Sequence, residues 1–278
     1  MLAQIPVLLI ALVVLSAGFG VLQWRWPSVR GQRVIRRGFF TDVGWWLFTP
    51  TVTKLFSGIF VAAVILGSTA LLGMSLTTDN LKGIAGRETF ITAWPVALQL
   101  GVFLVLADFL VYWQHRAFHT FERLWRIHAV HHSSTEIDWL SSVRLHPLND
   151  AISSAAVATP LILLGFSATT LAAYLPFLTL YAIALHANVN WTYGPLRSFV
   201  TSPVFHRWHH AAEQEALNKN FAGLFPVFDL LFGTFYLPRD RQPQVFGVVG
   251  RPLPSNLLGQ LIYPLRKPAA PSAEAAAA

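Results

Sequence analysis

The sequence predicts an all-α integral membrane protein: a helical bundle of four or five spans that carries a histidine-rich helical cap on its cytoplasmic side. Hydrophobic residues make up 54% of the 278 positions and charged residues only 12%, whereas soluble domains average about 25% charged residues. Several uncharged apolar runs approach the length that crosses a bilayer, about 20 residues. All ten histidines lie in one stretch, from His115 to His210.

The apolar runs predict the membrane spans in chain order. The first three runs are Ile5–Leu22, Leu55–Leu72 and Ala93–Trp113. No charged residue lies between Asp150 and His186, which leaves room for two short helices that form a hairpin. A pair of re-entrant helices is the alternative, and either arrangement returns His186 to the side that carries the other histidines.

The placement of basic residues predicts the orientation in the membrane, because Lys and Arg beside the spans mark the cytoplasmic side. Five arginines lie between the first two runs: Arg25, Arg30, Arg33, Arg36 and Arg37. We therefore expect the amino terminus and the connector Thr77–Glu88 outside, and the third span to reach the cytoplasmic face just before His115. The net charge of +7 is explained by these membrane anchors, and we expect no nucleic-acid partner.

Three regions are expected along the chain. Residues 1–92 hold the N-terminal membrane helices and the basic loop, residues 93–240 hold all the histidines, and residues 241–278 form a C-terminal extension with a low-complexity tail. The aromatic run Phe221–Leu237 is too short and too broken to span a bilayer. We expect it to pack on the histidine-bearing region or to lie at the membrane interface.

Eight histidines form three boxes: His115-x-x-x-His119, His128-x-x-His131-His132 and His206-x-x-His209-His210. Residues three or four apart project from one side of a helix, so each box presents several imidazole rings together. The adjacent histidines that end the second and third boxes differ by about 100° around a helix, enough for one ring to reach each of two neighbouring metals. The boxes predict a polynuclear metal site.

Five further residues are candidates for this site. His186 lies at the end of the predicted hairpin that meets the boxes, and we expect it to be a ligand. Asp108 lies two turns before the first box, where its carboxylate is placed to accept the second ring N–H of a histidine, directly or through water. Asn188 and Asn190 offer amide oxygens that ligate weakly, hold a metal-bound water or orient a histidine. For His146, ligation and a role beside the ligands or in a substrate pocket stay open.

The ligand types limit the metal chemistry. The chain has no cysteine, which excludes thiolate sites, iron–sulfur clusters and disulfides. A structural zinc needs four ligands, so the surplus of imidazoles favours two metals. Coordination by nitrogen with open positions suits iron that activates dioxygen, and the adjoining apolar helices offer a channel for a lipid chain, although the residues alone leave iron and zinc both open.

A different class of function is a histidine-rich membrane metal-binding protein without oxygenase activity, either a transporter or a zinc-stabilised sensor. A transporter typically has ionisable residues within several spans and often inverted repeats. Within the predicted spans we find only Asp108. This absence favours the oxygenase.

Several motifs carry a family resemblance by their order and spacing. They are Asp108, Tyr112–Arg116 with His119, Leu124–Ser134, His146-Pro147, His186–Asn188, Pro203–His210, Asn220 and Phe228–Phe235. Over about Ala107–Leu237 the chain resembles the fatty acid hydroxylase and sterol desaturase superfamily of integral membrane di-iron oxygenases, and most of all its bacterial sterol desaturase-like branch. Some branches have a further histidine or a glutamate where this chain has Asn188 and Asn190.

The resemblance implies an O2-dependent hydroxylase or desaturase of a lipid, whether a sterol, a fatty acyl chain or a related hydrophobic chain, with hydroxylation slightly favoured because it needs only one hydrogen abstraction. It implies that two iron ions are held by His115, His119, His128, His131, His132, His186, His206, His209 and His210. Zinc is a possible substitute in the isolated protein. Electrons would come from a separate donor, either cytochrome b5-like or a ferredoxin with its reductase. The site would face the cytoplasm from the inner membrane of a bacterium or the endoplasmic reticulum of a eukaryote.

Overall fold

The computed structural model describes residues 4–71, 73–75, 77, 88–250 and 253–266. Every regular element within these ranges is helical, and the only β-type pairings among them are two isolated bridges, Pro27 with Val189 and Ala211 with Phe246. The all-α prediction is therefore confirmed. Most of the connector Thr77–Glu88 and the low-complexity tail lie outside the described residues.

Apart from α2, which precedes the second run, the longer helices follow the predicted apolar runs. They are α1 (Ile5–Arg25), α2 (Phe39–Phe48), α3 (Lys54–Leu71), α5 (Val96–Thr120), α7 (Pro147–Leu164) and α8 (Ala168–His186). A π-helical turn, η2 (Thr49–Thr53), joins α2 to α3. The short elements are α6 (Glu122–His128), η3 (His131–Ser133), η4 (Trp139–Val143), η5 (Gly194–Ser198), α9 (Pro203–His209), η6 (Gln214–Ala216), α10 (Val227–Leu231), α11 (Leu257–Ile262) and η7 (Tyr263–Leu265).

Three helices, α1, α5 and α7, are long and apolar enough to cross a membrane, and α3 and α8 contain shorter apolar stretches. The predicted hairpin is present as α7 and α8. Gly165 ends α7 with a φ of 108°, a left-handed conformation that glycine adopts without steric cost. Helix α5 continues past its predicted end at Trp113 to Thr120. The first histidine box is therefore part of the same helix as the apolar run before it.

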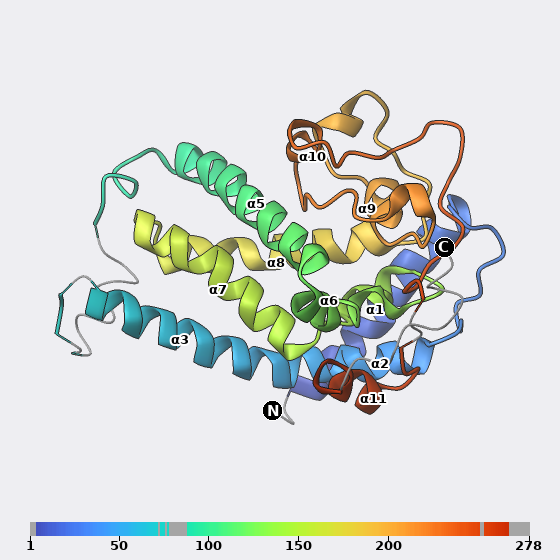
Figure 1. Cartoon of the computed structure of the whole chain (residues 1–278), viewed down its shortest axis with the longest axis horizontal. Coiled ribbons are helices and arrows are strands. Elements are labelled where there is room, and N and C mark those ends of the chain that lie inside the picture. Colours follow the sequence, from blue (N-terminus) through green and yellow to red (C-terminus); the bar gives the residue numbers. More distant parts are fainter. Residues whose placement is uncertain (1–3, 72, 76, 78–87, 251–252, 267–278) are drawn as a thin grey trace.

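The long helices α3, α5, α7 and α8 fill one half of the molecule, and the short elements gather in the other half (Figure 1). Helix α7 packs against α3 and α5, while α8 reaches the short elements η4 and α9. Phe103, Leu161 and Phe166 form the buried core between α5 and the hairpin. This packing places the ends of α5 and α8 beside the cap.

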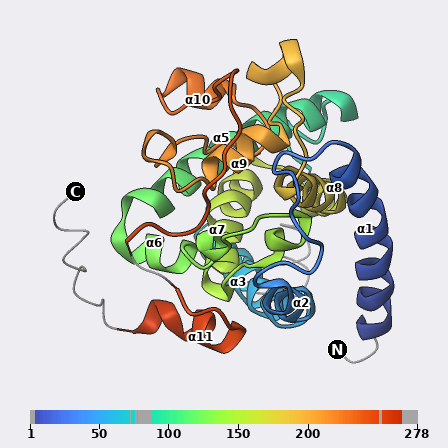
Figure 2. The same ribbon diagram turned by 90° about the vertical axis from the view of Figure 1, so that its right-hand side faces the viewer.

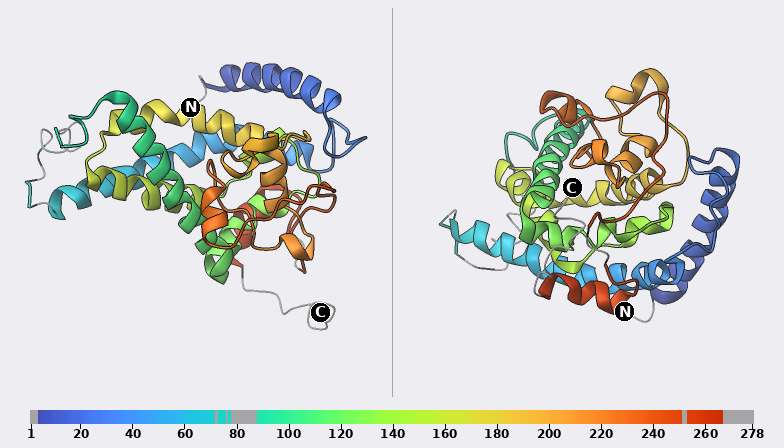
Figure 3. Two further views of the ribbon diagram at one scale, coloured as in Figure 1. Left: turned by 90° about the horizontal axis from the view of Figure 1, so that it is seen from above. Right: turned by 45° about the vertical axis from the view of Figure 1, so that its right-hand side comes forward.

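Helix α1 stands at the outside of the bundle, beside α8 (Figures 2 and 3). It has no buried residue, yet one of its faces packs on a small core that contains Trp46, Trp139 and Ile183. The indole N–H of Trp46 donates to the carbonyl oxygen of Leu8, with a separation of 2.8 Å. The contact between α1 and the bundle is therefore one-sided.

One of the predicted membrane anchors is instead a buried ion-pair partner. Arg36 is only 5% exposed, and its guanidinium lies 2.7 Å from a carboxylate oxygen of Asp42 and also contacts Asp138. Arg144 pairs with the second oxygen of Asp42. A buried charge is tolerated only when it is paired, and these pairs tie the start of α2 to η4. The anchor prediction is wrong for Arg36 because two carboxylates, that of nearby Asp42 and that of Asp138, which is distant in sequence, meet it in the interior.

We expect Asp42→Ala to lower the free energy of unfolding by about 3–5 kcal/mol, the usual cost of removing one partner from a buried pair. The thermal unfolding midpoint in detergent measures this loss. Asp240 is an exposed carboxylate, so Asp240→Ala serves as the control and should leave the midpoint nearly unchanged. Equal midpoints for the two variants would show that the buried pairs contribute little.

Candidate metal centre

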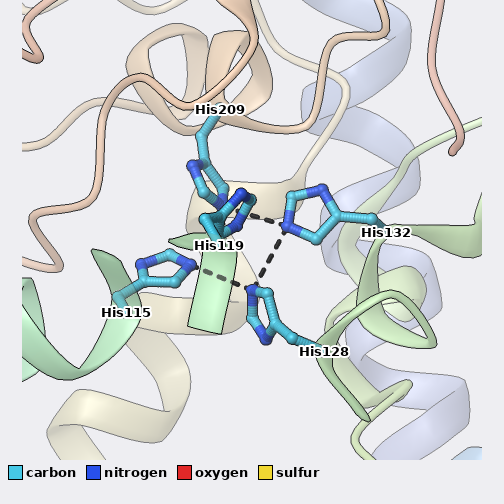
Figure 4. Close-up of side chains that lie close together, drawn as sticks. All are labelled: His115, His119, His128, His132 and His209. Atoms are coloured by element: carbon cyan, nitrogen blue, oxygen red, sulfur yellow. Dashed lines mark hydrogen bonds between the residues drawn. The ribbon is translucent and has the colours of Figure 1, made fainter. Parts of the chain in front are cut away.

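Nine of the ten histidines converge in two groups, and within each group the ligand nitrogens lie within 4.8 Å of one another. The five-histidine group, shown in Figure 4, consists of His115, His119, His128, His132 and His209. The four-histidine group consists of His131, His186, His206 and His210. The two groups are adjacent, because the rings of His132 and His210 stack with their centroids 4.3 Å apart. The structure thus brings together all nine histidines that the boxes and the hairpin single out.

The adjacent histidines of the second and third boxes divide between the groups, as their helical splay predicts. His131 belongs to the four-histidine group and His132 to the five-histidine group, and His210 and His209 divide in the same way. The second box is not one helix, however. Helix α6 ends at His128 and η3 begins the next turn at His131, so a change of helix type produces the split there.

Five of the nine rings point their Nδ1 atom at a carbonyl or amide oxygen. The pairs are His115 with Phe221 (2.9 Å), His128 with the Asn149 side chain (2.8 Å), His131 with Arg144 (3.3 Å), His186 with Ala182 (2.7 Å) and His209 with Lys219 (2.8 Å). These oxygens only accept, so Nδ1 carries the proton. In a neutral imidazole the other nitrogen, Nε2, is then a bare lone pair.

In each group two such lone pairs face each other. The Nε2 atoms of His115 and His128 lie 3.1 Å apart, and those of His131 and His186 lie 3.2 Å apart. Both rings of each pair already hold their proton on Nδ1, so no proton remains to join the two Nε2 atoms. A shared cation removes the repulsion between these lone pairs.

The electrostatics of the pocket also favours neutral ligands. Burial, reinforced by neighbouring histidines, lowers the pKa of His128 from 6.5 to about 3 and lowers the pKa of His132 well below its usual value. Neutral imidazole is the form that binds metals. The Nε2 atom of His119 is buried and has no hydrogen-bond partner among the described residues, which fits an atom whose partner is a metal ion.

The spacing of the nitrogens is that of ligands bound to one metal ion. The other Nε2 contacts within the groups are 3.1–3.2 Å, as between His132 and His209. A metal–nitrogen distance of about 2.1 Å separates two ligands by about 3.0 Å at a right angle and by about 3.4 Å at the tetrahedral angle. Five donors in one group also exceed the four of a structural zinc site.

The loop 218–225 orients two of the rings. Its carbonyls at Lys219 and Phe221 receive the Nδ1–H groups of the five-histidine group. Asn218 and Asn220 have φ values of 57° and 61°, a left-handed conformation that asparagine tolerates better than most residues. The Asn220 side chain donates to the carbonyl of Phe205, which fastens the loop to α9.

Asp108 acts on this loop and not on a histidine. Its carboxylate accepts the backbone N–H groups of Gly223, Leu224 and Phe225 at 2.9, 2.8 and 2.7 Å. The predicted direct bond to a ring N–H is therefore wrong, because three consecutive amides use both carboxylate oxygens. Asp108 instead fixes the loop that presents the Phe221 carbonyl.

The structure leaves the other three candidates outside both groups. His146 caps the N-terminus of α7 by accepting the N–H of Leu148. Asn188 pairs with the backbone N–H and carbonyl of Val29 at 2.8 and 2.9 Å, and Asn190 is exposed. Helix capping and the attachment of the chain after α1 use the polar atoms of His146 and Asn188, so the structure gives neither of them a place as a ligand. The other roles left open for these two residues and for Asn190 stay predictions.

Two residues that contact the histidines were missed in the sequence. Asn149 binds His128, and the Asn218 side chain binds His119. A signal existed for Asn149, because it lies in the first turn of a mainly apolar helix, where polar residues are often functional. The backbone carbonyls leave no signal in the sequence. The run Phe221–Leu237 packs on α5, where Phe221 and Phe228 contact Tyr112, as one of the two predicted arrangements required.

An apolar cavity of about 300 Å³ lies between α5, α8 and residues 222–224, and both histidine groups contribute to its wall through His115, His131, His186 and His206. The hydroxyl groups that line it are already bonded, Ser142 to the carbonyl of Trp139 and Tyr181 to that of Thr201. A second, more polar cavity of about 220 Å³ reaches His119, His132 and His209 from another side. The inner cavity, as we call the apolar one, therefore suits hydrocarbon beside the histidines.

The sequence profile of the fatty acid hydroxylase family matches residues 100–234. An ornithine lipid hydroxylase of Rhizobium tropici is 31% identical over 63% of this chain and 52% of its own length. The alkylglycerol monooxygenase of Homo sapiens is 34% identical over 48% of this chain and 30% of its own. A very-long-chain aldehyde decarbonylase of Oryza sativa is 29% identical over 58% and 60%, respectively. The chain thus spans about a third to three fifths of these relatives, and no solved structure matches it significantly.

We expect Asn149→Leu to weaken metal binding by about 10- to 100-fold, the range for loss of a residue that orients a ligand. Without the amide oxygen, nothing holds the His128 proton on Nδ1. Competition with a chelator, followed by metal analysis, measures the affinity. Asn149→Asp keeps an acceptor oxygen and should bind metal more tightly than Asn149→Leu, while Asn190→Leu, at an exposed position, should match the unaltered protein. Equal affinity in all variants would contradict the orienting role.

Proposed function

Because residues 100–234 belong to the fatty acid hydroxylase family, we propose that this protein is a membrane-bound di-iron oxygenase that hydroxylates or desaturates a lipid chain. The observation that carries the proposal is the pair of facing Nε2 lone pairs in each group, His115 with His128 and His131 with His186. Both groups border one apolar cavity. Metal-binding nitrogens and space for hydrocarbon thus meet at one place.

The nine clustered histidines are the proposed ligands of two iron ions. Iron bound there would supply the power to break an unactivated C–H bond with dioxygen, and zinc bound in its place would lack redox chemistry. The protein keeps the ligands neutral by burial and fixes five of the nine rings through Nδ1. The apolar wall of the inner cavity, which includes Leu104, Val111 and Leu185, excludes water and holds the chain.

The reaction balances only with an external reductant. In hydroxylation one C–H bond becomes C–OH, and the second oxygen atom leaves as water after two electrons and two protons are added. In desaturation two C–H bonds are lost and both oxygen atoms leave as water, again with two electrons and two protons. A separate cytochrome b5-like protein, or a ferredoxin with its reductase, is the proposed source of these electrons.

The proposed substrate is a lipid with a long alkyl chain. The names of the relatives refer to an ornithine lipid, an alkylglycerol and a very-long-chain aldehyde, which differ in their polar parts. The satisfied hydroxyl groups of the inner cavity support placement of the alkyl part beside the histidines. The arginines that follow α1 support a cytoplasmic site, in the inner membrane of a bacterium or the endoplasmic reticulum of a eukaryote.

We expect His131→Ala and His209→Ala, one from each histidine group, to abolish turnover while the protein still inserts into the membrane. His131 and His209 lie in η3 and α9, outside the long apolar helices, so insertion does not require these two rings. Membrane fractionation with a product assay tests this. His146→Ser is the matched control, since it removes the tenth histidine, keeps a helix-capping side chain and should retain activity. Activity in both alanine variants would mean that the site lies elsewhere.

We expect protein purified without added metal to contain two iron ions per chain, and labelled dioxygen to place one labelled oxygen atom in the lipid if the reaction is hydroxylation. Unlabelled product with a new double bond would identify desaturation. A chelator should abolish turnover, and ferrous iron but not zinc should restore it. Stoichiometric zinc with no oxygen uptake, even after reconstitution with iron, would favour a zinc-stabilised sensor or a transporter.

A further inference from the structure

A second apolar cavity adjoins the inner one. This outer cavity has a volume of about 610 Å³ and lies between α1, the junction of α2 with η2, and α8. One face of α1 lines it through Leu8, Ala11 and Leu15. Both volumes fall in the range of small-molecule sites, about 300–1,000 Å³.

The two cavities share part of their walls. Ser142, Leu145, Leu178 and Ala182 line both of them. The two cavities therefore adjoin along these four residues. Ala182 presents only a methyl group here, which makes it the smallest side chain of the shared wall.

The wall of the outer cavity suits hydrocarbon. Trp46 and Ile183 face the residues of α1 across it, and the Thr49 hydroxyl is already bonded to the carbonyl of Val143 at 2.9 Å. Among the described residues, Asp150 is the one charged residue that lines it, so an anionic headgroup would lose its hydration here and meet a like charge. An alkyl chain gains about 0.8 kcal/mol for each methylene that it buries.

One side of the outer cavity is built from residues outside the part of the chain that matches the family. The profile begins at residue 100, whereas α1 and the α2–η2 junction end at Arg25 and Thr53. Helix α1 also stands at the edge of the bundle, next to α8 (Figure 2). The other side, which includes Ala182 and Ile183, belongs to the matched region, so α1 closes a space that the matched region leaves open.

We propose that the outer cavity receives the part of the substrate's alkyl chain that is remote from the reacting carbon, and that Ala11 and Leu15 of α1 set the chain length that the protein accepts. This inference rests on the proposed lipid oxygenase function. The chain reaches the inner cavity along the shared wall, while α1 closes the far end of the space. Chain-length selection is thus a property of the N-terminal helix.

The test measures binding and not turnover, so its result is independent of the oxygenase proposal. Lysophosphatidylcholines that differ only in chain length are added to the metal-loaded protein, and apparent affinity is obtained from the rise of the thermal unfolding midpoint with concentration. For the unaltered protein, affinity should rise about fourfold with each methylene until the cavity is full, and then level off.

Three variants separate the possible outcomes. Ala11→Trp fills the cavity and should move the plateau to shorter chains, with about fourfold lower affinity for each excluded methylene. Leu15→Ala enlarges the cavity and should move the plateau to longer chains, so the test does not depend on a bulky substitution folding well. Ile10 is 65% exposed on another face of α1, and Ile10→Trp should keep the original plateau.

An unchanged plateau in both Ala11→Trp and Leu15→Ala would overturn the inference and would indicate that the cavity holds a structural lipid or detergent. A shift of the same size in Ile10→Trp would also overturn it, because the effect would then come from the membrane surface of α1. Failure of the oxygenase proposal has a different signature, which is the absence of any oxidised lipid from the iron-loaded protein.

Discussion

The structure depends on neutral imidazole rings whose Nε2 lone pairs are held face to face inside the protein. The Nε2 atom of His115 faces that of His128, and the Nε2 atom of His131 faces that of His186. No proton lies between the two atoms of either pair, because both rings carry their proton on Nδ1. Such contacts persist only if each ring is held by its other nitrogen and if a cation is shared between them. The long helices, the loop after α9 and the buried ion pairs can all be understood as the frame that keeps these rings in position.

The surrounding structure orients the histidine rings through backbone carbonyls more than through side chains. Asp229 accepts the N–H groups of Phe221 and Ala222, and Asp108 accepts the next three. Asp229 also binds the hydroxyl of Thr234, which lies 2.9 Å from the hydroxyl of Tyr112 on α5. Two carboxylates that bind no histidine therefore fix the carbonyls that do. The position of α5 thereby determines how the histidine rings held by these carbonyls are oriented.

The sequence predicts those parts of the site in which spacing alone determines geometry. Boxes of histidines at helical spacing identify eight of the clustered residues and the division of the adjacent pairs, and the end of the predicted hairpin identifies His186 as the ninth. The sequence could not predict Asp108 correctly, because its partners are amides more than a hundred positions away. The anchor assigned to Arg36 was wrong for the same reason, since burial depends on carboxylates that only the folded chain brings near.

The positions of the two groups' histidines along the sequence have a consequence for biosynthesis. His115, His119, His128 and His132 come from one short stretch and supply all but one member of the five-histidine group. The other group has only His131 until His186 and α9 have been made. A growing polypeptide therefore displays four imidazoles of one site well before the second site exists. Affinity alone favours copper over iron at such a half-built site, so correct loading depends on which ions the cell makes available during translation.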